Sequence, residues 1–167
     1  MTKAQKAFIE RIGNAARADM ARSGVLASMK TAQAILESGW GTSVLATKAN
    51  ALFGIKADSQ WSGLVFAVGS KEVFNGILIT VKIDFRAYDS WERSIADHAE
   101  FVMSESRYAH TLGETDYMVA CRAIHAAEYA TDPDYSNKLI KLIQDHNLNE
   151  YDGVEKGGNY DLQSRRG

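Results

Sequence analysis

Glu37 is the residue of this sequence best suited to acid–base chemistry, because it is a carboxylate that ends an otherwise apolar helical run. Ile35 and Leu36 precede it, and Trp40 follows it within a glycine-flanked turn. A glutamate partly buried against apolar groups favours its neutral form, which raises its pKa. The pattern therefore indicates a general acid that protonates a leaving oxygen, as glycoside cleavage requires. On position alone, Glu37 fits better the description of a helix-end carboxylate that faces solvent.

Glycoside hydrolysis commonly needs a second carboxylate, which activates water or stabilises positive charge at the anomeric carbon. Glu72 is one candidate, because it precedes the turn of a predicted hairpin and can lean over a cleft. Asp84 is another, and it faces the opposite side of its strand from its neighbours Ile83 and Phe85. Asp89 fits better as the cap of the next helix. Spacing alone does not choose between Glu72 and Asp84, and either is compatible with an exposed strand charge.

Several aromatic residues are candidates for sugar binding, since sugar rings stack on aromatic side chains and tyrosine hydroxyls add hydrogen bonds. Trp61 is a surface candidate, because it lies in a loop between polar residues. Tyr129 and Tyr135 flank a short polar segment, so we expect at least one of them at a helix entrance. Trp91 and Phe101, at helical spacing, are predicted core residues.

The sequence lacks the motifs that mark several other kinds of chemistry. The histidines show no metal-ligand spacing, and neither an HExxH nor a CxxC pattern occurs, so we predict no metal and no cofactor. A GxSxG elbow and a phosphate-binding glycine loop are also missing. The net charge of -2 gives no footprint for nucleic acid. Cys121, the only cysteine, lies in an apolar run and is predicted to be a small core residue rather than a nucleophile.

Hydrophobic periodicity predicts a mostly helical scaffold for these candidates. Gln33 and Glu37 lie four residues apart, so their side chains share one helix face. Alternating residues around Asn75-Gly76 predict an antiparallel hairpin. The last helix is expected to have Asp132 as its N-cap and Pro133 at its first position. The predicted helices are 4–22, 25–37, 43–48, 90–104, 115–127 and 132–146, and the predicted strands are 70–74 and 77–86.

Length and composition indicate one globular domain. A chain of 167 residues, 46% of them hydrophobic, is long enough to bury about two-thirds of its unfolded surface. We predict a domain over 1–150 and a glycine-rich linker or disordered tail over 151–167. No apolar segment approaches the roughly 20 residues of a membrane span, and the N-terminus lacks the apolar region of a signal peptide. We therefore expect a monomer without membrane or nucleic-acid partners, made in the cytoplasm or cut from a larger protein.

The segment 32–57, AQAILESGWGTSVLATKANALFGIKA, resembles the signature of glycoside hydrolase family 73, the bacterial cell-wall N-acetylglucosaminidases. A Glu-Ser pair alone would be weak, since lytic transglycosylases share it, but here further motifs follow in the expected order. The likeness touches most of the chain from about 25 to 147. The further motifs are Trp61-Ser62-Gly63, Ser70-Lys71-Glu72, Phe85-Arg86-Ala87-Tyr88-Asp89-Ser90, Tyr129-Ala130-Thr131-Asp132-Pro133-Asp134-Tyr135 and Lys138-Leu139-Ile140.

The resemblance implies an α+β, mostly α, lysozyme-like fold, in which a helical domain carries a small antiparallel β-hairpin lobe beside a substrate groove. It implies that Glu37 is the catalytic acid, that Glu72 is the second carboxylate on the hairpin, and that Tyr129 acts near the cleaved bond. The implied substrate is peptidoglycan, cut after N-acetylglucosamine. The residues expected to bind the glycan strand are Ser38, Asn50, Phe53, Trp61 and Tyr135.

One position departs from the family pattern. Where relatives often have Ala-Asn-Asn-Leu-Phe-Gly, this chain has Asn50-Ala51-Leu52, so one amide is missing, and with it any sugar contact that this amide makes in relatives.

The sequence is compatible with more than one mechanism and more than one function. Carboxylates about 5–5.5 Å apart favour a retaining double displacement, and a separation of about 6.5–9.5 Å favours inverting attack by water. A third route uses the N-acetyl oxygen of the substrate as nucleophile, with Tyr129 assisting. The alternative functions are a lytic transglycosylase and a non-catalytic peptidoglycan-binding module. The biological setting is a phage endolysin or the catalytic domain of a secreted autolysin, either of which is antimicrobial.

Overall fold

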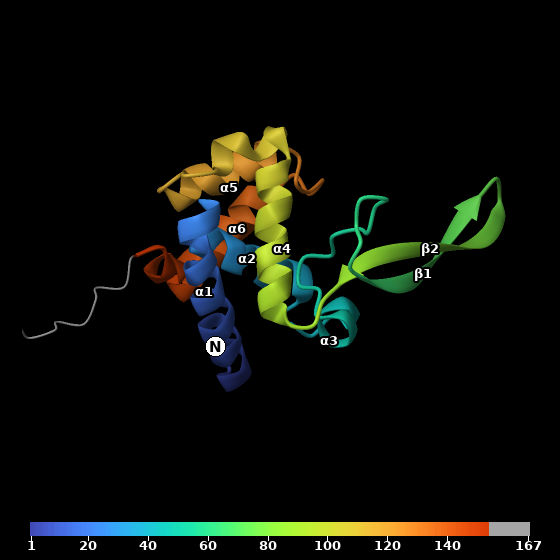
Figure 1. Cartoon of the computed structure of the whole chain (residues 1–167), viewed down its shortest axis with the longest axis horizontal. Coiled ribbons are helices and arrows are strands. Elements are labelled where there is room, and N and C mark those ends of the chain that lie inside the picture. The colour runs from blue at the N-terminus through green and yellow to red at the C-terminus, as the bar shows by residue number, and fades with distance from the viewer. Residues whose placement is uncertain (154–167) are drawn as a thin grey trace, which may run out of the picture.

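The computed structural model describes residues 1–153, in which a group of packed helices carries a long hairpin that projects from one side (Figure 1). The predicted class, mostly helical with a small antiparallel hairpin, is confirmed. In the described part of the chain no helix is long and apolar enough to cross a membrane. The helices are α1 (Lys3–Ser23), α2 (Ala27–Ser38), α3 (Val44–Ala49), α4 (Trp91–Ser104), η1 (Ser106–Thr111), α5 (Tyr117–Ala126), α6 (Tyr135–His146) and η2 (Leu148–Asp152), and the strands are β1 (Leu64–Phe74) and β2 (Ile77–Ala87).

Helix α2 is the centre of the helical group, because ten of its 12 residues are buried. A helix that is buried on nearly every side needs neighbours all round, and α1, α5, α6 and η2 pack against it. Its core contacts include Met29 and Ile35, which belong to the same apolar cluster as Leu139 and Ile143 of α6. Glu37 is the only exposed residue of α2. The buried helix therefore holds its one exposed carboxylate in a fixed place.

A tight turn ends α2 directly after Glu37. Gly39, Trp40 and Gly41 all adopt positive φ angles, of 56°, 62° and 76°. A side chain at Gly41 would meet the rings of Trp91 and Phe8 at 2.7 and 2.8 Å, so glycine is required there for close packing as well as for conformation. This turn reverses the chain, and Glu37 remains at the open end of the helix.

The hairpin forms around Asn75-Gly76, as the sequence predicts. Both turn residues have positive φ angles, and Phe74 pairs with Ile77 across a two-residue loop, as in a type I′ turn. The register continues without a break to the pair Leu64 and Ala87. Strand β1 is therefore longer than the predicted 70–74, because its first residues, Leu64, Val65 and Phe66, are consecutive apolar residues without the alternation that marks β2.

All six predicted helices differ from the observed ones by one to three residues at one or both ends, and for two of the starts the cause is visible. Helix α6 begins at Tyr135, because the oxygens of Asp132 are used in the preceding turn, where they accept from the backbone nitrogens of Asp134 and Tyr135. Ser90, not Asp89, caps α4, since its hydroxyl accepts a bond from the Arg93 nitrogen.

A further difference lies at the start of the predicted tail. Tyr151 and Asp152 belong to η2, and the Asp152 carboxylate accepts a hydrogen bond from the Ser28 nitrogen at the start of α2. Residues that pack on α2 therefore continue past residue 150, as far as Asp152. The rest of the predicted tail, 154–167, lies outside the described residues.

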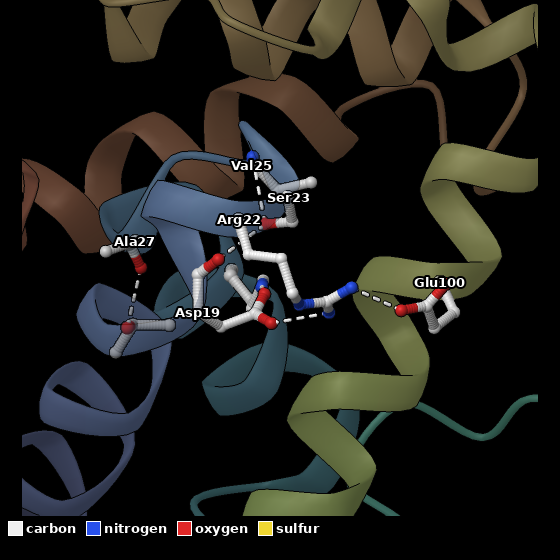
Figure 2. Close-up of polar contacts among 8 residues, drawn as sticks. Asp19, Arg22, Ser23, Val25, Ala27 and Glu100 are labelled. Carbon is white, nitrogen blue, oxygen red and sulfur yellow. Dashed lines mark hydrogen bonds and ion pairs between the residues drawn. The ribbon is translucent and has the colours of Figure 1, made fainter.

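A polar network joins α1 to α2 and α4. The fully buried ammonium of Lys30 on α2 pairs with Asp19 of α1, and the same carboxylate accepts from Arg22 Nη2 across 2.7 Å. Figure 2 shows the Arg22 guanidinium between Asp19 and Glu100 of α4. A buried ammonium needs such a partner, because unpaired it would be strongly destabilising.

Candidate functional site

Glu37 opens into a cavity of about 670 Å³, a volume within the range of small-molecule sites. The cavity lies where the end of α2 meets η1, the segment before the hairpin and the segment before α6. Its lining residues are Glu37, Phe53, Gly54, Ile55, Lys56, Asp58, Arg86, Phe101, Arg107, Tyr108, Tyr129, Ala130 and Thr131.

The Glu37 carboxylate is held by Tyr135, the first residue of α6. The Tyr135 hydroxyl donates to Glu37 Oε1 across 3.0 Å and accepts from Gln33 Nε2 across 3.1 Å. The prediction that Gln33 and Glu37 share a helix face is thus confirmed, and one hydroxyl joins the two side chains. Tyr135 is buried and is not among the cavity-lining residues, so its observed contact is with Glu37.

The Glu37 side chain reaches the surface, but the protein around its carboxyl removes much of the surrounding water, and this desolvation raises its pKa. The hydrogen bond from Tyr135 opposes this shift without cancelling it. The carboxyl therefore keeps its proton to a higher pH than an exposed glutamate does. Burial and the nearby Glu37 charge also raise the pKa of Tyr129 well above its ordinary value. The site thus holds a carboxyl that releases its proton reluctantly beside a hydroxyl that stays neutral.

Stacked aromatic rings hold Phe53 and Tyr129, which line the cavity, in place. Tyr129 lies nearly parallel to Tyr135, with ring centroids 5.9 Å apart and an interplanar angle of 20°. Phe53 stacks on the buried His98 at 4.1 Å, and His98 in turn meets Tyr129 edge to face. Phe53 and Tyr129 therefore present fixed aromatic surfaces to a ligand beside Glu37.

A second polar cluster fixes the base of the hairpin against α4. Arg86 Nη1 donates to both oxygens of Asp97, at 3.3 and 3.1 Å, and the Tyr88 hydroxyl donates to Asp97 Oδ2 across 2.7 Å. The Arg86 guanidinium also lies 4.7 Å from the centre of the Trp61 ring. Trp61 is partly buried here, and its indole nitrogen donates to the Leu64 carbonyl. In this structure Trp61 supports Arg86 and is not among the cavity-lining residues.

Ser38 and Asn50, both expected to bind glycan, have local partners in this structure. The buried Ser38 hydroxyl donates to the Ala34 carbonyl and accepts from the Gly41 nitrogen, which holds the turn after Glu37. Asn50 Nδ2 donates to the Tyr88 carbonyl across 3.0 Å. Neither is among the cavity-lining residues, so their sugar contacts stay predictions.

Glu72 lies far along the hairpin, opposite Ile79, and is exposed. The register places it on the same face of the hairpin as Phe66 and Phe85, opposite the face that carries Arg86. It is not among the cavity-lining residues, and neither is Asp84. The structure thus brings together Glu37, Tyr129, Phe53 and Tyr135 but does not bring Glu72 to them.

Four charged residues of the cavity wall were not among the predicted site residues. They are Lys56, Asp58, Arg86 and Arg107, and Arg107 lies over the Tyr108 ring at 4.7 Å. Arg86 belongs to the family motif at 85–90. Lys56 and Asp58 lie at the end of the signature segment or just beyond it, and that position is the only sequence signal that pointed to them. Arg107 carries no such signal.

Comparison with known proteins places the chain in a family. Residues 13–148 match the glucosaminidase family described as mannosyl-glycoprotein endo-beta-N-acetylglucosaminidase. The chain belongs to this glucosaminidase family. The resemblance drawn from the sequence motifs is confirmed.

Curated glucosaminidase relatives align with most of this chain. Exo-glucosaminidase LytG of Bacillus subtilis is 36% identical over 155 residues, which are 90% of this chain and 54% of LytG. Peptidoglycan hydrolase FlgJ of Vibrio cholerae is 36% identical over 125 residues, 71% of this chain and 37% of FlgJ. The chain thus spans about half, or less, of the length of these relatives.

Solved structures of this family share the fold. The glycoside hydrolase domain of Salmonella typhimurium FlgJ, truncated at its C-terminus, superimposes with a TM-score of 0.74 at 34% identity, covering 84% of this chain and 96% of that one. The catalytic domain of the Listeria monocytogenes autolysin Auto gives a TM-score of 0.79 at 28% identity, covering 91% and 89%. The helical group with a projecting hairpin is therefore a glucosaminidase-family fold.

Proposed function

We propose that this chain is the catalytic domain of a peptidoglycan hydrolase, an endo-β-N-acetylglucosaminidase that cuts the glycan strand after N-acetylglucosamine. The observation that carries the proposal is the Glu37 carboxyl, which has a raised pKa and opens into a cavity beside Tyr129 and Phe53. Family membership supports the substrate class, because relatives are named glucosaminidase and peptidoglycan hydrolase.

Glu37 acts as the general acid in this proposal. Its protonated carboxyl donates a proton to the glycosidic oxygen while the bond from that oxygen to the anomeric carbon of N-acetylglucosamine breaks. Positive charge develops at the anomeric carbon. The neutral Tyr129 hydroxyl is available to orient the substrate or the incoming nucleophile beside it. The aromatic rings of Phe53 and Tyr129 offer surfaces on which the sugar rings stack.

Two routes complete the reaction. In the first, Glu72 positions the attacking water or stabilises the developing charge, which requires the hairpin to approach the cavity when the glycan binds. In the second, the N-acetyl oxygen of the substrate attacks the anomeric carbon and Tyr129 assists, so no second carboxylate is needed. The exposed position of Glu72 makes the first route dependent on movement of the hairpin. We favour the first route, and the Glu72 variant argued in the Discussion separates the two.

The test is the substitution Glu37→Gln, which keeps the shape of the side chain and removes the acidic proton. We expect purified walls to release no new reducing ends with this variant, while thermal unfolding and circular dichroism stay close to those of the parent chain. Glu10→Gln on the exposed face of α1 is the matched control and should cut at the parent rate. Lysis at near-parent rate by Glu37→Gln would rule the proposal out.

Product analysis separates the proposal from its rivals. Hydrolysis after N-acetylglucosamine leaves reducing N-acetylglucosamine ends, whereas a muramidase leaves reducing muramic acid and a lytic transglycosylase leaves anhydro-muramic ends. These rivals matter because some relatives are named N-acetylmuramidase and LytG is named an exo-enzyme. Mass spectrometry of the fragments identifies the end, and fragment length distinguishes endo from exo cleavage. A binding module would give no clearing in a wall-containing gel.

The setting proposed for this activity is the bacterial cell wall, as part of an autolysin or of a phage endolysin. One relative of the same fold is named an autolysin. Clearing of the producing strain's own walls in a gel assay, with no clearing of walls from other species, would support the autolysin setting.

A further inference from the structure

Three cations line the cavity that holds Glu37, although the whole chain carries a net charge of -2. They are Lys56, Arg86 and Arg107, and they outnumber the lining carboxylates Glu37 and Asp58. The raised pKa of Glu37 further reduces the negative charge that the lining carboxylates contribute. The cavity is therefore more cationic than the protein around it.

The three cations differ in how far their charge is already neutralised. Arg86 is largely compensated, since it bonds Asp97 and lies 3.8 Å from Asp58. Lys56 is exposed and makes no ion pair with the described residues. Arg107 lies over the Tyr108 ring and has one loose ion pair, 3.8 Å from Nε to Glu105, and about half of its side chain is exposed. Lys56 and Arg107 are thus the cations that remain available to a ligand.

These two cations come from different walls of the cavity. Lys56 follows Phe53, Gly54 and Ile55 in the segment before the hairpin, whereas Arg107 belongs to η1. Among the described residues neither forms an ion pair with Glu37, so neither charge is neutralised by that carboxyl. Both charges are therefore available to parts of a bound strand that lie over these two walls.

We propose that Lys56 and Arg107 form a subsite for the carboxylates carried by the muramic acid residues of the strand. This inference rests on the proposed function. In a peptidoglycan strand N-acetylglucosamine is uncharged, and every second sugar carries a lactyl group that ends in a carboxylate or in a peptide with its own carboxylates. A strand cut after N-acetylglucosamine has muramic acid on the other side of the bond. Cations beside the cleavage position then select peptidoglycan over uncharged N-acetylglucosamine polymers.

The test measures binding, so that it does not depend on turnover. The full chain with Glu37→Gln is titrated with soluble glycan strands from walls freed of phosphate polymers, and strand length is checked afterwards. The strands are used in three forms: with peptides, with peptides removed so that only lactyl carboxylates remain, and with all carboxylates converted to amides. Because exposed ion pairs contribute little each, we expect the Kd of the amidated strands to be about three- to tenfold larger than that of the unmodified strands. This difference should shrink with added salt.

Variants connect this difference to the two residues. The pair Lys56→Gln and Arg107→Gln should reduce the ratio of amidated to unmodified Kd to about one, the limit for a site without these charges. The matched pair Lys48→Gln and Arg93→Gln removes two exposed cations outside the cavity and should keep the parent ratio. Loss of affinity on peptide removal assigns the contact to peptide carboxylates. A gain of affinity on peptide removal that is lost again on amidation assigns it to the lactyl carboxylate, which is free only when the peptide is gone.

Several outcomes would overturn the inference. Equal binding of all three strand forms would do so, even if the chain hydrolyses them and the proposed function holds. Tighter binding only to walls that keep their phosphate polymers would mean that Lys56 and Arg107 bind phosphate groups rather than carboxylates, and would also overturn the inference. Carboxylate-dependent binding without any release of reducing ends would uphold the subsite and overturn the proposed function instead.

Discussion

The hydroxyl of Tyr135 donates a hydrogen bond to Oε1 of Glu37 across 3.0 Å, so the first residue of α6 holds the last turn of α2. Gln33 donates to the same hydroxyl from one turn earlier in α2. A hydrogen bond to the carboxylate favours its ionised form, whereas burial favours the neutral form. The two effects oppose each other at Glu37, and burial is the stronger.

Replacing Tyr135 by Phe should therefore raise the pKa of Glu37 further. A general acid must be protonated, so activity falls as pH rises through its pKa, and the alkaline limb of the kcat/KM profile should move to higher pH. The ring stacked on Tyr129 remains, and loss of the two hydrogen bonds of the hydroxyl, to Glu37 and from Gln33, should lower the free energy of unfolding by about 1–3 kcal/mol. Tyr117→Phe, away from the cavity, is the control. An alkaline limb that stays in place would show that Tyr135 does not set this pKa.

Glu72→Gln tests whether the hairpin supplies the second carboxylate. If Glu72 activates water, kcat should fall by roughly a hundredfold or more, the usual size of acid–base catalysis. Asp84→Asn is the matched control, because it removes a carboxylate from the other face of the same hairpin. Near-parent kcat for Glu72→Gln together with a large loss for Tyr129→Phe would favour the substrate-assisted route. A loss confined to Asp58→Asn would move the second role to the carboxylate that already lines the cavity.

Local sequence patterns predicted those features that depend on neighbouring residues. The four-residue spacing of Gln33 and Glu37 placed both on one helix face, and Asn75-Gly76 supplied the two positive φ angles of the hairpin turn. Cys121 is a buried core residue, as its apolar surroundings indicated. In each case a short segment contains all the physical information that decides the outcome.

Features that depend on how elements dock were beyond the sequence. Asp97 could be placed on a helix, but its bonds to Arg86 arise only when α4 meets the base of the hairpin. The inward turn of the Ser38 hydroxyl depends on the chain reversal at Gly41. The position of Glu72 away from the cavity follows from the length and direction of the hairpin, which alternation within the strands does not specify.

His98 should make the stability of the chain depend on pH. It is fully buried, and among the described residues neither ring nitrogen has a hydrogen-bond partner. Burial and the nearby Lys30 charge hold its pKa well below the ordinary value of 6.5. The unfolded chain takes up a proton near pH 6.5 and the folded chain does not, so stability is lost as pH falls below that point, by up to about 1.4 kcal/mol per pH unit.

The measurement for His98 is the free energy of unfolding in denaturant at pH 7 and pH 5. His98→Phe keeps a ring against Phe53 and removes the titrating group, so its stability should fall less between the two pH values than that of the parent. Replacing the exposed His110 by Gln should leave the parent slope unchanged. Parallel slopes for parent and His98→Phe would mean that His98 protonates without cost in the folded chain.

The buried pair of Lys30 and Asp19 should respond unequally to loss of either partner. Asp19→Asn leaves the fully buried Lys30 ammonium without an anion, which should cost about 3–5 kcal/mol. Lys30→Met should cost less, because Asp19 keeps its bond to Arg22 (Figure 2).

Burial lowers the pKa of Lys30 and Asp19 opposes that shift, so Asp19→Asn should lower this pKa further. The neutral amine form of Lys30 then becomes accessible, so the loss of stability caused by Asp19→Asn should shrink as pH rises toward 10. Denaturant unfolding at pH 7 and pH 10 measures both effects, and equal losses for the two variants at pH 7 would contradict this account.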